Sequence, residues 1–285
     1  MRWLDPADQA RLRALGLSPR RPASAAAAPG RHHALVRGFS RDFAQHRAYS
    51  PGDEARAIDW KAYARLDRFY VREYRAEDRF PLAVLVDVTG SMGFSGDGRP
   101  AKLDLARRLA AALAWLALAQ GDEAGLVPLG GGARLPLRAG AAQLTAFDDA
   151  LTALSPVGSD FAGALEAAAD SLPRHALSIV VSDLMGDTAR VLKALRRLSS
   201  GRREIRVLRV VDPEERDFPF EGPLRVEGLE GGEVLIDARE AGAAYRAAFL
   251  QQDEAYRASL RRAGVPYAVA TTDGPWHSAL ARLLA

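Results

Sequence analysis

The chain has 285 residues, of which 39 are basic and 36 acidic, so its formal net charge is +3. Nearly half of the residues are apolar and a quarter are charged, which is typical of a globular protein and excludes a disordered or collagen-like chain. The small net charge gives no support for nucleic-acid or membrane binding through charge alone. Cysteine is absent, which excludes disulfides, thiolate zinc sites and cysteine nucleophiles.

Charge is distributed unevenly along the chain. Residues 1–80 hold 16 basic and 10 acidic side chains, a net charge of +6, whereas residues 81–285 hold 23 and 26, a net charge of −3. We therefore expect a short helix and linker over 1–30, a basic segment over 31–80 that packs on the main domain, and a main domain over 81–285. The N-terminus has no apolar segment of the kind found in a signal peptide, and the longest apolar run, Leu109–Ala119, is too short to span a membrane. We therefore expect a cytoplasmic protein with no transmembrane segment.

The N-terminal part contains few regular elements. Asp5 and Pro6 are residue types that begin helices, and this helix should run to about Leu15. Proline and glycine at positions 51 and 52 predict a turn, after which Asp53 would cap a helix carrying apolar residues at 58, 62 and 66. Aromatic and β-branched residues then predict a strand over Phe69–Tyr74.

From Pro81 onward, apolar runs alternate with helical patterns. The run Leu82–Val86 is continuous, as in a strand that is buried on both faces. This alternation predicts an α/β fold with a doubly wound, mainly parallel sheet. The other expected elements are a helix over Ala101–Gln120, a hairpin over Gly125–Leu137, helices over Ala141–Leu154 and Phe161–Ser171, a strand over Leu177–Val181, a helix over Thr188–Leu198, a strand over Ile205–Val211, a hairpin over Leu224–Ile236, a helix over Tyr245–Arg262, a strand over Tyr267–Ala270 and a terminal helix.

Oxygen-bearing side chains are expected to gather where the strands end, because sites in such sheets form at the carboxyl ends of the strands. One group follows the first apolar run, a second follows Leu177–Val181, and a third precedes the helix that begins at Phe161. Hard oxygen ligands suit Mg²⁺ or Mn²⁺. With two carboxylates at most, the cation would still attract an acidic group from outside, which favours recognition over hydrolysis. The candidate ligands are Asp87, Thr89, Ser91, Ser159 and Asp183, with Asp160 as the alternative to Ser159.

This pattern resembles the metal-ion-dependent adhesion site (MIDAS) of von Willebrand factor A domains. The family motif is written Asp-x-Ser-x-Ser, then Thr, then Asp, and here Asp87-x-Thr89-x-Ser91 is followed by Ser159 and Asp183. Thr89 stands where the motif has serine, and Ser159 stands where it has threonine, so both positions keep a hydroxyl group. The resemblance implies a Rossmann-like von Willebrand A fold that binds a divalent cation.

A second resemblance comes from the segment ahead of the first apolar run. It is similar to the signature of the domain-of-unknown-function 58 family, whose members join it to a von Willebrand A-like domain. The family's association with MoxR-type AAA+ ATPases implies such an ATPase as the partner of a non-enzymatic protein that acts in protein assembly or maturation. The residues that carry the resemblance are Arg47-x-Tyr49-x-Pro51-Gly52-Asp53-Glu54-x-Arg56-x-Ile58-Asp59-Trp60, Ala64-Arg65, Val71-Arg72-Glu73-Tyr74 and Gln120-Gly121-Asp122-x-x-Gly125-Leu126.

Charged residues in that segment have a structural interpretation. Arg47, Asp53, Arg56 and Asp59 alternate with aromatic residues, and we expect them to form a buried ion-pair scaffold. A partner-binding surface is the alternative.

Two other functions are weighed against metal-dependent recognition. A serine hydrolase would use Ser91, because residues 89–93 nearly match the Gly-x-Ser-x-Gly nucleophile elbow, with Asp183 or Asp237 and then His277 as its partners. Thr89 stands at the first glycine position, however, so this hypothesis ranks second. Nucleic-acid binding by the basic N-terminal segment ranks third. There is no Gly-x-x-x-x-Gly-Lys-Ser/Thr motif, which argues against ATP hydrolysis by this chain.

Overall fold

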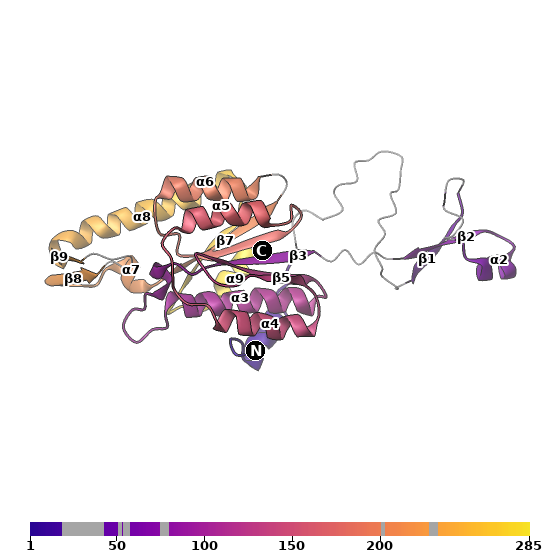
Figure 1. The fold of residues 1–285 in the computed structure, drawn as a ribbon, viewed down its shortest axis with the longest axis horizontal. Coiled ribbons are helices and arrows are strands. Elements are labelled where there is room, and N and C mark those ends of the chain that lie inside the picture. The colour runs from indigo at the N-terminus through magenta and orange to yellow at the C-terminus, as the bar shows by residue number, and fades with distance from the viewer. Residues whose placement is uncertain (19–42, 51–52, 54–57, 75–79, 201–202, 228–232) are drawn as a thin grey trace. The chain divides into compact units, whose positions relative to one another are not determined.

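In a computed structural model, the chain forms two compact units (Figure 1). The larger unit comprises Met1–Arg21 and Phe80–Ala285, and the smaller one comprises Pro22–Arg79. The structure describes every residue except 19–42, 51–52, 54–57, 75–79, 201–202 and 228–232. The boundaries that we expect near residues 30 and 80 remain predictions, because 30 and 79 lie outside the described ranges.

A six-stranded sheet forms the centre of the larger unit, with the strand order β10-β7-β6-β3-β4-β5. Every neighbouring pair is parallel except β4 and β5, which form the predicted hairpin. In the middle of the sheet, Leu85 lies opposite Val127 on one side and Val180 on the other. The expectation of an α/β fold with a mainly parallel sheet is confirmed. The strands are β3 (Pro81–Asp87), β4 (Glu123–Leu129), β5 (Leu135–Arg138), β6 (Leu177–Ser182), β7 (Glu204–Val211) and β10 (Tyr267–Thr271).

Helices cover both faces of this sheet (Figure 1). Along β3, Val84 contributes to the apolar core on one face and Leu85 to the core on the other, as the alternation of a strand requires. The first core contains residues of α1 (Pro6–Leu12), α3 (Lys102–Ala119), α4 (Ala141–Thr152) and α9 (Trp276–Leu284). The second contains residues of α5 (Phe161–Ser171), α6 (Thr188–Ser199) and α8 (Ala238–Arg262).

Helix α8 begins earlier than the sequence pattern predicts. The pattern places its start at Tyr245, because the preceding alanines and glycine have no apolar periodicity. Asp237 caps the helix through a hydrogen bond from the Arg239 backbone, and Phe218 packs close to Gly242. A side-chain cap and a tertiary contact thus extend the helix through a segment of low amphipathicity. A short helix α7 (Pro213–Asp217) and the hairpin of β8 (Pro223–Glu227) and β9 (Glu233–Asp237) come before it.

The smaller unit contains an antiparallel pair, β1 (Phe43–Ala48) and β2 (Tyr70–Tyr74), and the helix α2 (Trp60–Leu66). The helix is capped by Asp59 and not, as expected, by Asp53. Ile58 forms an isolated antiparallel bridge with Val71, so the chain is still extended there and a helix cannot begin before Asp59.

The expectation of a buried ion-pair scaffold in this unit is wrong for the pair Arg47 and Asp53. Arg47 does bind Asp53 at 2.8 Å, but the two side chains are 40% and 19% exposed, so this pair is not buried. Asp59 is buried, and its carboxylate accepts hydrogen bonds from the backbone amides of Lys61 and Ala62. Arg56 lies outside the described residues. How this segment packs on the main domain stays a prediction.

Candidate functional site

The first part of the candidate site is the carboxylate of Asp87 at the end of β3, which is completely buried. Its Oδ1 accepts hydrogen bonds from the backbone N and the Oγ1 of Thr89, at 2.9 and 2.8 Å. Its Oδ2 accepts one from Ser182 Oγ at 2.5 Å. Thr89 Oγ1 lies 3.1 Å from Ser91 Oγ, at the turn into the short 3-10 helix η3 (Gly90–Gly93). Three hydroxyl groups thus lie at or beside one buried carboxylate.

The environment of Asp87 disfavours its ionised form. Burial raises the pKa of this carboxyl from 3.8 to about 7, and the nearby negative charge of Asp183 adds to the increase. The hydrogen bonds from Ser182 and Thr89 act in the opposite direction but do not outweigh burial. Asp87 is therefore a buried carboxyl that is stabilised by neutral groups and would be ionised more readily beside a cation.

The loop that carries Ser159 lies beside this turn. The backbone amide of Val157 donates to the Val88 carbonyl, and the amide of Gly90 donates to the Gly158 carbonyl at 3.0 Å. Gly158 has a φ of +90°, and a Cβ there would lie 2.6 Å from the Gly130 carbonyl oxygen. Glycine is thus required where the loop approaches β4. The structure brings the loop of Ser159 next to the turn that holds Thr89 and Ser91.

Asp160, the alternative to Ser159, is engaged elsewhere. It caps α5 by accepting a hydrogen bond from the Gly163 amide at 3.0 Å, and it forms an ion pair with Arg190 at 2.9 Å. These two contacts lower the pKa of Asp160 against the effect of its slight burial, the cap having the larger influence. Ser159 itself is exposed.

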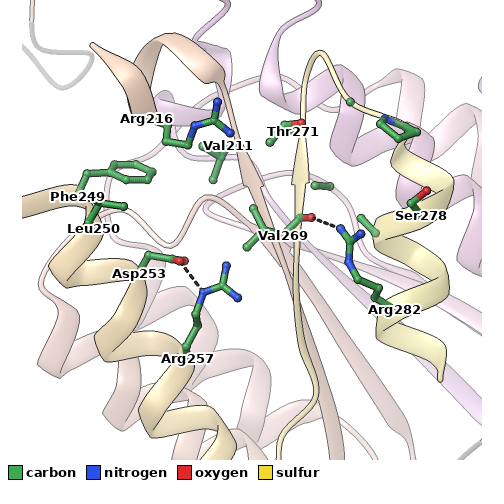
Figure 2. Close-up of a pocket in the computed structure, with 14 residues that line it drawn as sticks. Val211, Arg216, Phe249, Leu250, Asp253, Arg257, Val269, Thr271, Ser278 and Arg282 are labelled. Atoms are coloured by element: carbon green, nitrogen blue, oxygen red, sulfur yellow. Dashed lines mark hydrogen bonds and ion pairs between the residues drawn. The ribbon is translucent and has the colours of Figure 1, made fainter. Parts of the chain in front are cut away.

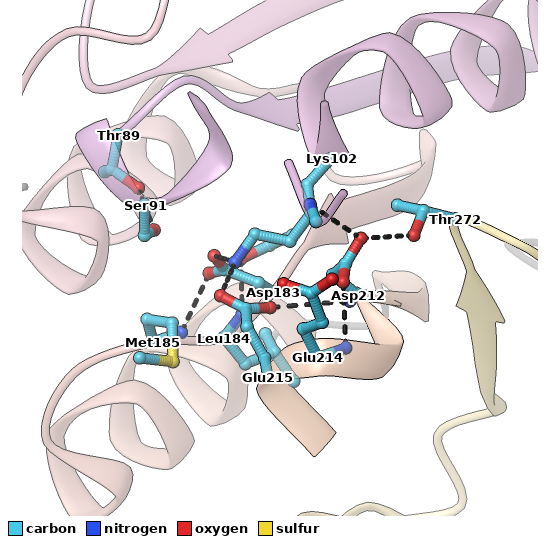
Figure 3. Close-up of polar contacts among 12 residues, drawn as sticks. Thr89, Ser91, Lys102, Asp183, Leu184, Met185, Asp212, Glu214, Glu215 and Thr272 are labelled. Atoms are coloured by element: carbon cyan, nitrogen blue, oxygen red, sulfur yellow. Dashed lines mark hydrogen bonds and ion pairs between the residues drawn. The ribbon is translucent and has the colours of Figure 1, made fainter. Parts of the chain in front are cut away.

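The second part of the candidate site is an ion-paired cluster around Asp183, which follows β6 (Figure 3). Asp183 Oδ2 accepts a hydrogen bond from Lys102 Nζ at 2.7 Å, and Oδ1 accepts one from the Met185 amide at 3.0 Å. Lys102 is fully buried and also donates to Glu215 Oε1 at 2.5 Å. Burial lowers the pKa of Lys102, but the two carboxylates together raise it, so the lysine stays charged. Burial raises the pKa of Glu215 against the effect of Lys102.

A further ion pair, between Arg99 and Asp212, lies beside this cluster. Figure 3 shows Asp212 with Glu214 and Thr272. Asp212 follows β7 and accepts hydrogen bonds from Arg99 and from Thr272 Oγ1, the latter at 2.5 Å. Arg99 also binds Glu214 at 2.6 Å. The end of β7 and the residue after β10 therefore contribute polar groups to the same edge as β3 and β6.

Sequence reasoning missed several of these residues. Asp212 directly follows the run Ile205–Val211, so the rule that selected Asp87 and Asp183 would also have found it, and Glu215 lies three residues further along in α7. Lys102 gives no such signal, because one lysine at the start of an alanine-rich helix usually faces water. Its burial is a consequence of packing against residues far away in the chain.

The residues of the hydrolase hypothesis are not brought together. His277 Nε2 bonds to Asp8 Oδ1 at 2.9 Å, and its ring stacks on Trp276. Asp237 caps α8, and Asp183 is held by Lys102. Among the contacts of the described residues, none joins the Ser91 hydroxyl to a histidine. The geometry gives the hydrolase hypothesis no support.

The charges of the site can be counted. Asp87, Asp183 and Glu215 carry three negative charges when ionised, against the one positive charge of Lys102, so the net charge is −2. In the described part of the chain, no group of three or more His, Cys, Asp or Glu side chains is placed to hold a metal ion. The predicted ligand set is not a group of this type, because it contains only two carboxylates and its other three members are hydroxyl side chains.

Comparisons with known proteins identify the family to which the chain is similar. The model of the family described as "Protein of unknown function DUF58" matches residues 45–259. An uncharacterized protein of Mycobacterium tuberculosis is 28% identical over 267 residues, which cover 90% of this chain and 82% of the relative. Two solved structures, BatB from Bacteroides thetaiotaomicron and an aerotolerance-related membrane protein from Bacteroides fragilis, are 19% and 20% identical. They cover 71% and 72% of this chain and 96% of their own, each with a TM-score of 0.45.

One expectation is corrected by these comparisons. A cytoplasmic location was expected from the sequence, but the Bacteroides fragilis structure is described as that of a membrane protein, which contradicts this expectation. We do not retain it. Within the described ranges, no helix has the length and apolar character needed to cross a bilayer.

Proposed function

The chain belongs to the DUF58 family, and from this premise we propose that it is a metal-dependent protein-interaction domain without enzymatic activity. Asp87, Thr89, Ser91 and Ser159 would hold Mg²⁺ or Mn²⁺, with Asp183 as a second nearby carboxylate. The observation that carries the proposal is the buried carboxyl of Asp87, which has hydroxyl partners and no ion-pair partner among the described residues. Such a group gains stability from a cation.

The donor set fits a hard divalent cation. Every proposed ligand offers oxygen, which Mg²⁺ and Mn²⁺ prefer. Asp87 is the one carboxylate among these four ligands, so they would leave a bound dication incompletely neutralised. Both carboxylate oxygens of Asp183 are engaged, one by Lys102 and the other by the Met185 amide. Asp183 would therefore contribute to the site through its negative charge, which also acts on Asp87.

The proposed partner supplies an acidic side chain. Since hydroxyls form most of the ligand set, the bound cation would keep positive charge for a carboxylate from outside the chain. The resemblance of the sequence to the DUF58 signature names a MoxR-type AAA+ ATPase as the partner to test. The role that follows is that of an adaptor in protein assembly or maturation.

Metal binding is tested by calorimetric titration with MgCl₂ and MnCl₂. We expect one site in the wild type, no binding in Asp87→Asn and weaker binding in Ser91→Ala and Ser159→Ala. Ser155→Ala is the matched control, because Ser155 is also exposed and lies in the same loop. Equal binding by the wild type and Asp87→Asn would contradict the assignment.

Partner binding is tested with a purified MoxR-type ATPase in the presence of Mg²⁺ or of a chelator. We expect the complex to form only with the metal and to be lost in Asp87→Asn. A complex that forms equally well in the chelator would show that recognition does not use the metal.

A further inference from the structure

Strand β10 is the last strand at one end of the sheet, and the backbone amides on its outer edge pair with no described strand. The outward carbonyls of Val269 and Thr271 accept hydrogen bonds from Arg282 and from the Gly274 amide. The Val207 amide donates to the Pro266 carbonyl and the Thr272 amide to the Val211 carbonyl, so the even-numbered residues of this segment point toward β7. In a parallel ladder the alternate residues point the other way. The amides of Tyr267, Val269 and Thr271 therefore face outward, where no described strand pairs with them.

A groove follows this edge between α8 and α9. One hollow of about 320 Å³ lies over Val269–Thr271, and a second of about 420 Å³ lies over Gly264–Tyr267. Arg257 lines both hollows, so they adjoin along the strand. Figure 2 shows β10 with α8 on one side and α9 on the other, and with side chains of both helices directed toward the strand.

The groove has a basic lining. Four arginines line it, against one acidic residue, Asp253. Asp253 is paired with Arg257, and Asp217, which lies outside the lining, is paired with Arg216. Among the described residues, no ion pair involves the guanidinium of Arg261 or Arg282, so these two arginines supply the uncompensated positive charge of the groove. The lining arginines are Arg216, Arg257, Arg261 and Arg282.

The groove also has apolar surface at its rim and an arginine at the strand edge. Leu250 is 63% exposed at the rim, and Phe249 lies next to it in the lining. Arg282 donates to the outward carbonyl of Val269 at 3.2 Å, which places its guanidinium directly at the strand edge (Figure 2). A ligand here would meet backbone donors, guanidinium groups and some apolar surface together.

We propose that this groove binds an acidic, extended peptide segment of a partner protein, which adds to the sheet as a strand beside β10. Backbone pairing would supply sequence-independent affinity, as it does when a peptide adds to an open sheet edge. The arginines would select carboxylate side chains through charge-assisted hydrogen bonds. This surface is separate from the site at Asp87 and does not depend on the function proposed for that site.

Basic side chains beside an edge strand also have a purely protective role, since charge discourages pairing with other chains. The two roles differ in outcome. Protection requires that no peptide binds, whereas the proposal requires that an acidic peptide binds and a basic one does not.

The test measures fluorescence anisotropy with a labelled heptapeptide in which aspartate or glutamate alternates with valine. Two control peptides carry lysine at the acidic positions, or proline at the valine positions to remove backbone donors. We expect only the first peptide to bind, equally well in a chelator and in Asp87→Asn. Loss of binding in the chelator would overturn the independence of the two sites.

The protein variant is Arg257→Gln/Arg282→Gln, with Arg134→Gln/Arg138→Gln at the opposite edge of the sheet as its matched control. We expect the first variant to weaken binding by about tenfold or more and the control to leave it unchanged. Bound peptide should also slow hydrogen exchange at the amides of Val269 and Thr271. Equal affinity in both variants, no slowing, or no binding of any peptide would overturn the proposal.

Discussion

Asp87 and Asp183 follow neighbouring parallel strands, but the protein treats their carboxylates differently. Asp87 is surrounded by neutral hydroxyls and the Thr89 amide, and its pKa rises to about 7. Asp183 binds the ammonium of Lys102, which also holds Glu215. One carboxylate is neutralised within the fold and the other is not.

This difference separates a structural role from a binding role. A buried charge that is paired has a structural role, because removing its partner leaves it uncompensated and destabilises the fold. A buried carboxyl without a paired cation destabilises the fold when it is ionised. Its presence at Asp87 is therefore better explained by binding than by stability. The following predictions test whether the two carboxylates differ in this way.

The largest effect is expected from Lys102→Met. Without the ammonium, the buried Asp183 and the partly buried Glu215 are left uncompensated, at a cost of roughly 3–5 kcal/mol in the free energy of unfolding. Chemical denaturation gives this value directly. Lys193→Met, an exposed lysine on α6, is the control and should unfold like the wild type. An unchanged Lys102→Met variant would mean that the ion-paired cluster is not structural.

A pH-dependent effect is expected at Asp87. Its folded-state pKa of about 7 lies above the ordinary value of 3.8, so between these values the native protein holds a proton that the unfolded chain has released. Its contribution to stability is therefore complete below the ordinary value and is lost as pH rises through about 7.

Asp87→Asn does not titrate, so without metal its stability relative to the wild type should increase from about pH 5 to about pH 8. Urea denaturation in a chelator at several pH values measures this difference. If the difference stayed constant with pH, Asp87 would have an ordinary pKa and the contrast with Asp183 would disappear.

A smaller effect is expected from Gly158→Ala. The positive φ and the short approach to the Gly130 carbonyl should together cost about 1–3 kcal/mol and displace the loop of Ser159. Metal affinity should fall as well. Gly98→Ala is the control, because Gly98 also has a positive φ but no atom lies within 4 Å of its added Cβ. Metal binding that falls equally in both variants would not support a role for the Ser159 loop.

The smallest effect is expected from Asp53→Asn in the smaller unit. Arg47 lowers the pKa of Asp53, but both side chains are partly exposed, and such pairs contribute little to stability. The thermal midpoint should stay within error of the wild-type value, in contrast to Lys102→Met. A clear drop would restore the interpretation of this pair as part of a buried scaffold.

Local sequence patterns determined the α/β fold and the parallel sheet. A continuous apolar run such as Leu82–Val86 requires burial on both faces, and strands of this kind alternate with helices only in a parallel sheet. Because parallel strands end at one edge, the sequence also predicted that Asp87 and Asp183 would lie at the same edge of the sheet. Both conclusions depend on residues close together in the chain.

Tertiary structure alone decided which carboxylate is neutralised. Lys102 and Asp183 are 81 positions apart, and nothing near Lys102 in the sequence shows that its ammonium is buried. The same holds for Asp59, which caps α2 in place of Asp53 because Ile58 pairs with Val71. Charge pairing and capping are fixed by packing between distant segments, which a local pattern does not contain.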